Sequence, residues 1–395
     1  MKSITEKLGA PPVLPSVKNP PSLRELNLNI TVSTPMAGGG VEAGTVDEKR
    51  PVRVPSIRGH LRYWWRMINR NIPDKDTKES DIWGSTEKPG EVYVSISEQP
   101  NVHLRYCNNN FGFHRYGPEN YALFSFLPNR QEPGKNIAQE NFTFTLKLRY
   151  PEIFHDDVRL ALSAWLYFGG IGARTRRGCG SLSCDENPAG LGEILKAAPY
   201  ITLWRKKAGD NLPLSAWSYA VECYRDYRQK NRNRGQGNRP GRSKWPEADS
   251  LRQITGKSVD RHKTPITSPL PSFPRAALGM PIIFHFKDRG EPNDVTVVPK
   301  FVPKIKDSSS RMASPVITKA LCENGTWYSA IVILPHDEVF DVQIKLEGVN
   351  RAYNIPSLKG TIYRNTQPMH GQPDAISGFE KYISISGDFK KEVEK

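Results

Sequence analysis

The chain has 395 residues, enough for two or more domains of ordinary size, and 37% of them are hydrophobic, so a packed core is expected. No apolar run approaches the roughly 20 residues that a membrane-spanning helix needs, so we expect no secretory signal, no membrane partner and a cytoplasmic location. The five cysteines form no CxxC pair, which argues against a zinc ribbon or a disulfide scaffold and favours free thiols.

The formal net charge of +15 is concentrated in three segments, 49–70, 169–181 and 225–244, which hold 18 basic residues and one acidic residue. The remaining 38 basic and 40 acidic residues nearly cancel. Clustered cations of this kind are typical of proteins that contact a polyanion. Solvated surface charge is the simpler alternative. A membrane surface fits less well, because lipid-binding basic stretches usually lie on an amphipathic anchor helix.

The first part of the chain predicts a mixed α/β module. Residues 1–25 are rich in proline and predict a flexible lead, and the module follows over 26–186. Alternating apolar residues predict strands at 26–33, 92–96 and 142–148. Apolar residues at helical spacing predict a helix over 57–70 and a buried helix over 156–168. In the first helix Trp64 and Trp65 share the apolar face, so we expect them in the core.

The second part of the chain is predicted to divide at residue 266. Residues 187–265 indicate a helical, basic connecting region, with helical composition from 215 to 231. Residues 266–395 indicate a second sheet-rich module and a charged tail, with strands at 282–286, 295–298, 331–334 and 342–346. We therefore expect an α+β fold built on antiparallel sheets.

The segment Gly169–Ser181 is the strongest candidate binding loop. Its five glycines allow a close backbone approach, and its three arginines are suited to phosphate. The Walker A pattern GxxxxGK[ST] is absent. With no acidic residue in the loop, we expect the arginines to have no internal partners. A packing loop is the alternative.

Two further basic motifs are candidates. Arg58, Arg62, Arg66 and Arg70 are spaced to form a stripe opposite the tryptophan face, next to His60, unless they are an ordinary solvated helix face. The motif Arg242-Ser243-Lys244-Trp245 interleaves cations with an aromatic ring, a combination that can pair phosphates and stack a base.

These motifs, in this order, resemble a known family. Arg58-Gly59-His60-Leu61-Arg62-Tyr63-Trp64-Trp65-Arg66, then Ile82-Trp83-Gly84-Ser85, then the glycine/arginine loop, are similar to the RAMP superfamily. The motifs at 241–247, 273–279 and 311–315 look like those of the first RAMP subunit of the Cmr-type (type III-B) CRISPR effector complex. The resemblance implies two ferredoxin-like (RRM-like) modules with a helical basic insertion between them.

The resemblance also implies a function. It is that of a non-catalytic RNA-binding subunit of a ribonucleoprotein, which contacts the guide (CRISPR) RNA near its 3′ end and helps capture target RNA for antiviral defence. The partners would be both RNAs and the other Cmr subunits, with no cofactor. The residues expected to contact RNA are Lys49, Arg50, Arg53, Arg58, His60, Arg62, Arg66, Arg174, Thr175, Arg176, Arg177, Arg242, Ser243, Lys244 and Trp245.

Two alternatives remain open from the sequence. Some RAMP relatives are metal-independent ribonucleases that process the guide with a histidine as acid/base, and His60 is the best-placed candidate, although no lysine or tyrosine partner can be assigned. The other alternative is a purely structural assembly subunit. His155-Asp156-Asp157 and His336-Asp337 lack the further spaced ligands that a metal site needs.

Overall fold

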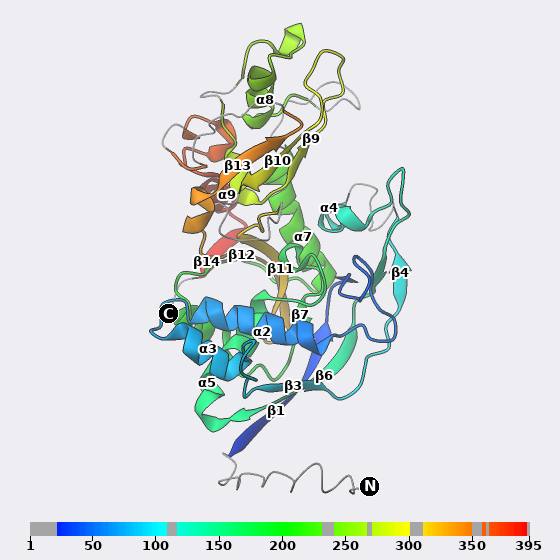
Figure 1. Cartoon of the computed structure of the whole chain (residues 1–395), viewed down its shortest axis with the longest axis vertical. Coiled ribbons are helices and arrows are strands. Elements are labelled where there is room, and N and C mark those ends of the chain that lie inside the picture. The colour runs from blue at the N-terminus through cyan, green and yellow to red at the C-terminus, as the bar shows by residue number, and fades with distance from the viewer. Residues whose placement is uncertain are drawn as a thin grey trace, which may run out of the picture.

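Two four-stranded antiparallel sheets, one in each half of the chain, organise the computed structural model (Figure 1). The structure describes residues 22–108, 117–230, 241–266, 271–300, 311–349, 358–360 and 363–392. Most of the predicted lead, 1–25, lies outside these ranges. Within them, none of the helices combines the length and the apolar character needed to cross a membrane.

The first sheet has the strand order β3-β6-β1-β7 and lies in the lower part of Figure 1. Its unit runs along the chain as β1 (Leu23–Val32), α2 (Val54–Ile68), β3 (Tyr93–Ile96), β6 (Phe142–Pro151), α5 (His155–Phe168) and β7 (Leu182–Ser183). All neighbouring strands are antiparallel. The predicted strands and helices of the first module are therefore confirmed. The helix α3 (Lys75–Trp83) was not predicted.

The core of this unit lies between the sheet and the pair α2 and α5. Alternate residues of β1 and β6 point inward, and Leu28, Ile30 and Val32 of β1 are buried. Trp64 and Trp65 of α2 are buried in the same cluster, as predicted. The indole N–H of Trp65 donates to Asp157 Oδ1 at 2.8 Å, so its polar atom is satisfied inside the core.

The second sheet has the order β11-β12-β8-β14. Its unit runs as β8 (Thr202–Lys206), α7 (Pro213–Arg225), β11 (Val316–Glu323), β12 (Thr326–Ile333), α9 (Ala375–Ser386) and β14 (Phe389–Glu392). The sheet extends across the predicted boundary at 266, because β8 and α7 come from the predicted connecting region. Residues 390–392, predicted as part of a charged tail, pair with β8.

The remaining strands form two smaller sheets. Residues between α7 and β11 supply β9 (Ile282–Phe284) and β10 (Val295–Lys300). β10 pairs with both β9 and β13 (Gln343–Glu347), near α8 (Glu247–Thr255) at the top of Figure 1. Three of the four strands predicted for the second module thus lie in this separate sheet. A second small sheet joins β2 (Met36–Ala37), β5 (Asn136–Ala138) and β4 (Leu104–Tyr106) beside α4 (Pro118–Ala122).

A buried lysine connects the two units. Lys319 lies on β11, has no exposed surface, and its Nζ donates to the carbonyl oxygens of Leu166 and Gly169 at 3.0 and 2.5 Å, where α5 ends. Burial lowers the pKa of Lys319 to about 7.

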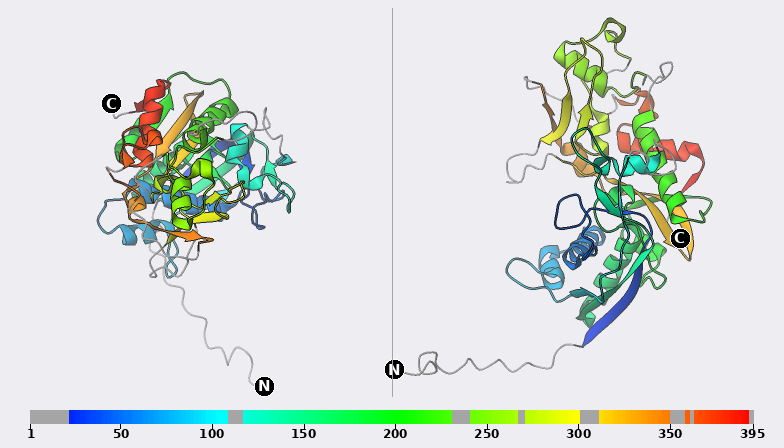
Figure 2. Two further views of the ribbon diagram at one scale, coloured as in Figure 1. Left: turned by 90° about the horizontal axis from the view of Figure 1, so that it is seen from above. Right: turned by 90° about the vertical axis from the view of Figure 1, so that its right-hand side faces the viewer.

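Figure 2 (right) shows the first unit, with blue β1, at one end of the long axis and the yellow β9–β10 region at the other.

Candidate nucleic-acid interface

Three segments that are distant in the sequence meet beside the start of α2. The turn after β2 pairs with the glycine/arginine loop, since Ala173 N donates to Ala37 O at 2.5 Å. A Cβ atom added at Gly39 would lie 3.2 Å from the Cα of Gly172, and both glycines have positive φ. Glycine at these two positions therefore allows the turn and the loop to touch.

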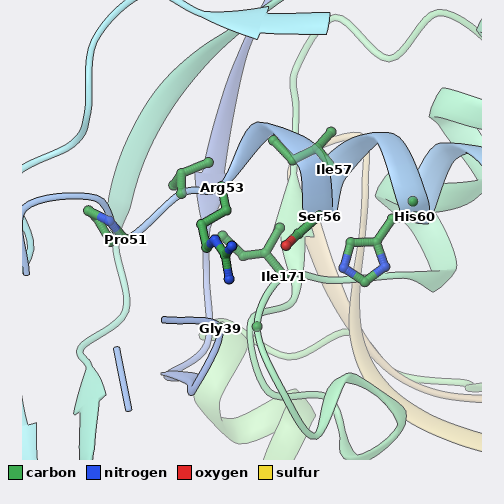
Figure 3. Close-up of a pocket in the computed structure, with 10 residues that line it drawn as sticks. Gly39, Pro51, Arg53, Ser56, Ile57, His60 and Ile171 are labelled. Atoms are coloured by element: carbon green, nitrogen blue, oxygen red, sulfur yellow. The ribbon is translucent and has the colours of Figure 1, made fainter. Parts of the chain in front are cut away.

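A pocket of about 360 Å³ lies where these segments and α2 meet (Figure 3). Buried Val52, Ile57 and Ile171 contribute its apolar lining. Arg53, Ser56 and His60 project from the start of α2 toward the side that carries Gly39 and Ile171. The full lining is Gly39, Pro51, Val52, Arg53, Ser56, Ile57, Gly59, His60, Ile171 and Gly172.

The rim of this pocket is basic. Lys49, Arg50 and Arg53 are all exposed. The amides of Lys49 and Arg50 are held by Asp47 Oδ1 at 3.0 and 3.1 Å, and Arg53 Nη1 donates to Gly40 O at 3.2 Å. In the part of the chain that the structure describes, no ion pair involves these three side chains. We call these three exposed cations, of which Arg53 lines the pocket, the basic rim.

His60 lies on the pocket side of α2. Its ring stacks on the indole of Trp165 with centroids 6.3 Å apart and planes 13° from parallel. Burial lowers the pKa of His60, so the imidazole is neutral at pH 7. Among the residues described, no side chain hydrogen-bonds to this ring.

The predicted arginine stripe of α2 is engaged internally. Arg58 donates through Nε and Nη2 to Trp83 O, at 3.2 and 2.8 Å, and through Nη1 to Val92 O at 2.8 Å. Arg62 and Arg66 share the buried carboxylate of Glu79. Hydrogen bonds from these two arginines outweigh the burial that opposes them and hold the pKa of Glu79 below its usual value. The partners come from the unpredicted helix α3 and the residues after it.

Arg70, the last residue of that stripe, pairs with Glu338 at 3.1 Å. The alternative of an ordinary solvated helix face therefore does not hold for Arg58, and the other three arginines are each paired with a carboxylate. Because Glu79 carries one negative charge, Arg62 and Arg66 together leave one net positive charge on this face of α2.

The arginines of the glycine/arginine loop also point inward. Arg174 donates to the carbonyls of Tyr121 and Ala122, at 3.2 and 2.6 Å. Arg176 donates to the carbonyl of Ser314 and to the hydroxyl of Tyr63. The expectation that these side chains have no internal partners is wrong, because three of these four acceptors are backbone carbonyls, which the sequence does not reveal.

Arg177 is the most enclosed residue of the loop. Its side chain is buried, donates to Val316 O at 2.8 Å, and lies 4.0 Å above the ring of Tyr224. Its carbonyl accepts the indole N–H of Trp217 at 2.6 Å. Thr175, half-buried, accepts the Gly178 amide through its carbonyl at 3.0 Å. The loop is thus attached to the second unit.

The third predicted motif packs into the interior near α8. Trp245 is buried and meets Tyr227 edge-on, with centroids 5.4 Å apart, so it offers no face for base stacking. Arg242 pairs with the buried carboxylate of Asp249 at 2.6 Å. Ser243 Oγ accepts the Trp245 amide at 3.1 Å, and Lys244 is half-buried. This motif lies by α8, at the opposite end of the molecule from α2 (Figure 1).

Two lining residues, Ser56 and Gly59, had no distinguishing signal in the sequence as binding residues. A glycine in the middle of a helix is the one hint, because glycine there destabilises the helix by about 1 kcal/mol relative to alanine.

For metals, the described residues contain no group of three His, Cys, Asp or Glu side chains that could hold an ion.

Comparison with known proteins identifies the class of the first unit. Residues 29–183 match the model of the RAMP superfamily, which confirms the resemblance predicted from the motifs. This segment contains the β2 turn, α2 and the glycine/arginine loop, and therefore the whole pocket. A search of curated proteins finds no match.

The whole chain has a fold similar to that of Cmr1 from Pyrococcus furiosus, solved in its apo form. The TM-score is 0.52 at 17% identity, with 94% of this chain and 98% of Cmr1 covered. A chain of a type III-B Cmr-beta complex, solved with cognate target RNA and AMPPnP, matches with a TM-score of 0.39 at 13% identity. This match covers 93% of the present chain and 100% of the Cmr-beta chain. Cmr6 from Pyrococcus furiosus matches with a TM-score of 0.24 at 16% identity, and the match covers 41% of this chain and 98% of Cmr6. Scores below 0.5 do not establish a shared fold.

Proposed function

We propose that this chain is an RNA-binding subunit of a type III-B CRISPR (Cmr) effector complex that binds single-stranded RNA at the basic rim of the pocket. The observation that carries the proposal is the group of exposed cations Lys49, Arg50 and Arg53 beside a glycine-lined pocket. Solvated cations without carboxylate partners are free to pair with phosphates. The RAMP match over residues 29–183 and the Cmr1-like fold support the assignment to a Cmr complex.

Within that complex, we assign the chain the role that the motif resemblance implies. It contacts guide RNA near the 3′ end, helps to capture target RNA, and is itself non-catalytic. Lys49, Arg50, Arg53 and His60 make the contacts with RNA. Arg62 and Arg66 contribute one net charge to the local field, and the loop arginines hold the site together.

The proposal extends to two ferredoxin-like modules. Each four-stranded sheet follows the chain order β-α-β-β-α-β, as in β1-α2-β3-β6-α5-β7 and β8-α7-β11-β12-α9-β14. In each, the third strand lies between the first and the second, and the fourth lies beyond the first. This repeated order supports two modules, 26–186 and a second one that begins near β8 rather than at 266.

A salt titration of RNA binding tests the electrostatic part. With roughly five phosphate contacts, log K for a single-stranded RNA should fall with log salt at a slope of about −3 to −4. The variant K49A/R50A/R53A should reduce the slope by about 2, because three contacts are lost. The variant K257A/K287A/K345A removes three exposed lysines near α8, β9 and β13 and should keep the slope of the unmodified chain. A slope near zero for the unmodified chain would refute RNA binding and favour a purely structural subunit.

Incubation with labelled guide precursor in the absence of metal tests the enzyme alternative. We expect no cleavage by the purified chain, because His60 has a ring stack and no described side chain placed to relay its proton. Cleavage that disappears in His60→Ala would replace the proposal with a guide-processing ribonuclease.

A further inference from the structure

The pocket differs from its rim in chemistry. The rim is cationic, whereas buried Val52, Ile57 and Ile171 supply apolar walls inside. The polar side chains that line the pocket are Arg53, whose Nη1 donates to Gly40 O, Ser56 and the neutral imidazole of His60 (Figure 3). Apolar walls with a few oriented polar groups are characteristic of small-ligand sites, and about 360 Å³ is at the small end of their range.

The start of α2 is poorly suited to hold a phosphate inside the pocket. Helix N-termini bind phosphates through free amide N–H groups. Here Pro55 has no N–H, and the amides of Ser56 and Ile57 already donate to Arg53 O at 3.0 and 3.1 Å. We therefore expect a phosphate to pair with Arg53 and its basic neighbours rather than with the amides of α2.

We propose that the pocket is a receptor for one unpaired nucleobase, whose sugar and phosphate remain at the basic rim. The inference rests on the proposed RNA binding and deepens it. Ser56 Oγ can donate and accept a hydrogen bond, and a neutral imidazole offers one donor and one acceptor, which suits the mixed edges of bases. The volume admits one base, so neighbouring nucleotides of a strand must lie outside.

Glycine 59 keeps the edge of this receptor open. A Cβ atom added at Gly59 would meet no atom within 4 Å, so we expect a larger side chain to be accommodated there. Ser56 is also exposed, and its hydroxyl points into the pocket. Substitutions at these two positions can therefore fill the pocket while leaving Lys49, Arg50 and Arg53 in place.

The test compares two RNAs of equal length and charge, a single-stranded oligonucleotide and its fully abasic counterpart, on the full chain. The unmodified chain should bind the RNA with bases about tenfold more tightly. Ser56→Leu and Gly59→Leu should bind both RNAs equally, at the abasic level, with an unchanged salt slope. Gly192→Leu is the matched control, because Gly192 in α6 (Leu191–Ala197) also has open space around an added Cβ, and it should behave like the unmodified chain.

A second arm uses AMP to identify the source of the base. Discrimination between the two RNAs that is lost on filling the pocket supports a base from the RNA strand. Saturable AMP binding that Ser56→Leu abolishes, without discrimination between the RNAs, supports a nucleobase receptor that takes a free nucleotide. If RNA binds with the expected salt slope but neither effect is seen, the receptor is refuted and the proposed function stands. A zero slope refutes the proposed function itself.

Discussion

Two arginine-bearing segments border the same pocket and use their charge in opposite ways. In the segment 49–53, the basic side chains lie in solvent. In the loop 169–181, all three arginines donate to backbone carbonyls of α4 or of the residues at the start of β11. Each segment has three basic residues and no acidic one. The difference comes from their surroundings, since the loop lies against carbonyls that would otherwise be buried without donors.

The comparison shows that a basic motif can have a structural role at a binding site. A buried carbonyl without a donor costs about 1–3 kcal/mol. Arginine is suited to such positions because its planar group has five donors and remains charged. The loop arginines therefore fix the loop to the second unit, and the segment 49–53 is left to supply the cations for RNA.

The largest expected effect is on stability at Arg177. Arg177→Ala should lower the free energy of unfolding by about 3 kcal/mol, because Val316 O loses a charged donor. Chemical denaturation measures this value. Arg50→Ala is the control and should change stability by less than about 0.5 kcal/mol. Equal stabilities for the two variants would contradict the structural role, as would a loss of RNA affinity per folded molecule in Arg177→Ala at unchanged stability.

The next effect is the pH dependence that Lys319 gives to stability. Its folded pKa of about 7 is below the unfolded value of 10.5, so between these values the unfolded chain binds a proton that the folded chain lacks. Raising the pH above 7 should therefore stabilise the fold, by up to about 1.4 kcal/mol per pH unit. Lys319→Met should remove this part of the pH dependence. The measurement is denaturation of both proteins at pH 6 to 9, and parallel curves would show that Lys319 does not titrate there.

The first unit was predictable because its signals are local. Apolar and polar residues alternate from Leu26 to Val32 in β1 and from Phe142 to Tyr150 in β6, and α2 has a clear apolar face. The second unit lacked such signals. Its strand β8 has five residues, and its partner β12 follows more than 100 residues later. In β11, Thr318 and Lys319 interrupt the apolar pattern although both are buried.

The candidate site was predictable in composition and not in orientation. The cations at 49–53, His60 and the glycines were visible in the sequence, and the structure brings Arg53, His60, Gly39 and Gly172 together around one pocket. The direction of each arginine depends on distant acceptors, such as Glu79 for Arg66 and Ser314 O for Arg176. Trp245 suggested base stacking in the sequence, but it is buried and packs edge-on against Tyr227.

The smallest expected effects separate two exposed arginines of similar appearance, Arg53 and Arg66. Arg66→Ala should cost about 0.5–1 kcal/mol of stability, since Glu79 keeps Arg62 as a partner and the Arg66 side chain is 47% exposed. Arg53→Ala should cost less than about 0.5 kcal/mol. For RNA binding, Arg53→Ala should have the larger effect of the two variants. It should reduce the salt slope by about 0.7, whereas Arg66→Ala should leave the slope unchanged.

The contribution of Arg66 should also depend on pH. The Arg66–Glu79 pair holds the pKa of Glu79 below its unfolded value, so the stability it contributes is present above the unfolded pKa and is lost as the pH falls through the folded one. The stability difference between the unmodified chain and Arg66→Ala should thus disappear in acid, while that of Arg53→Ala stays near zero throughout. A salt slope that falls equally in both variants would mean that RNA draws Arg66 away from Glu79, and the RNA surface would then extend along α2.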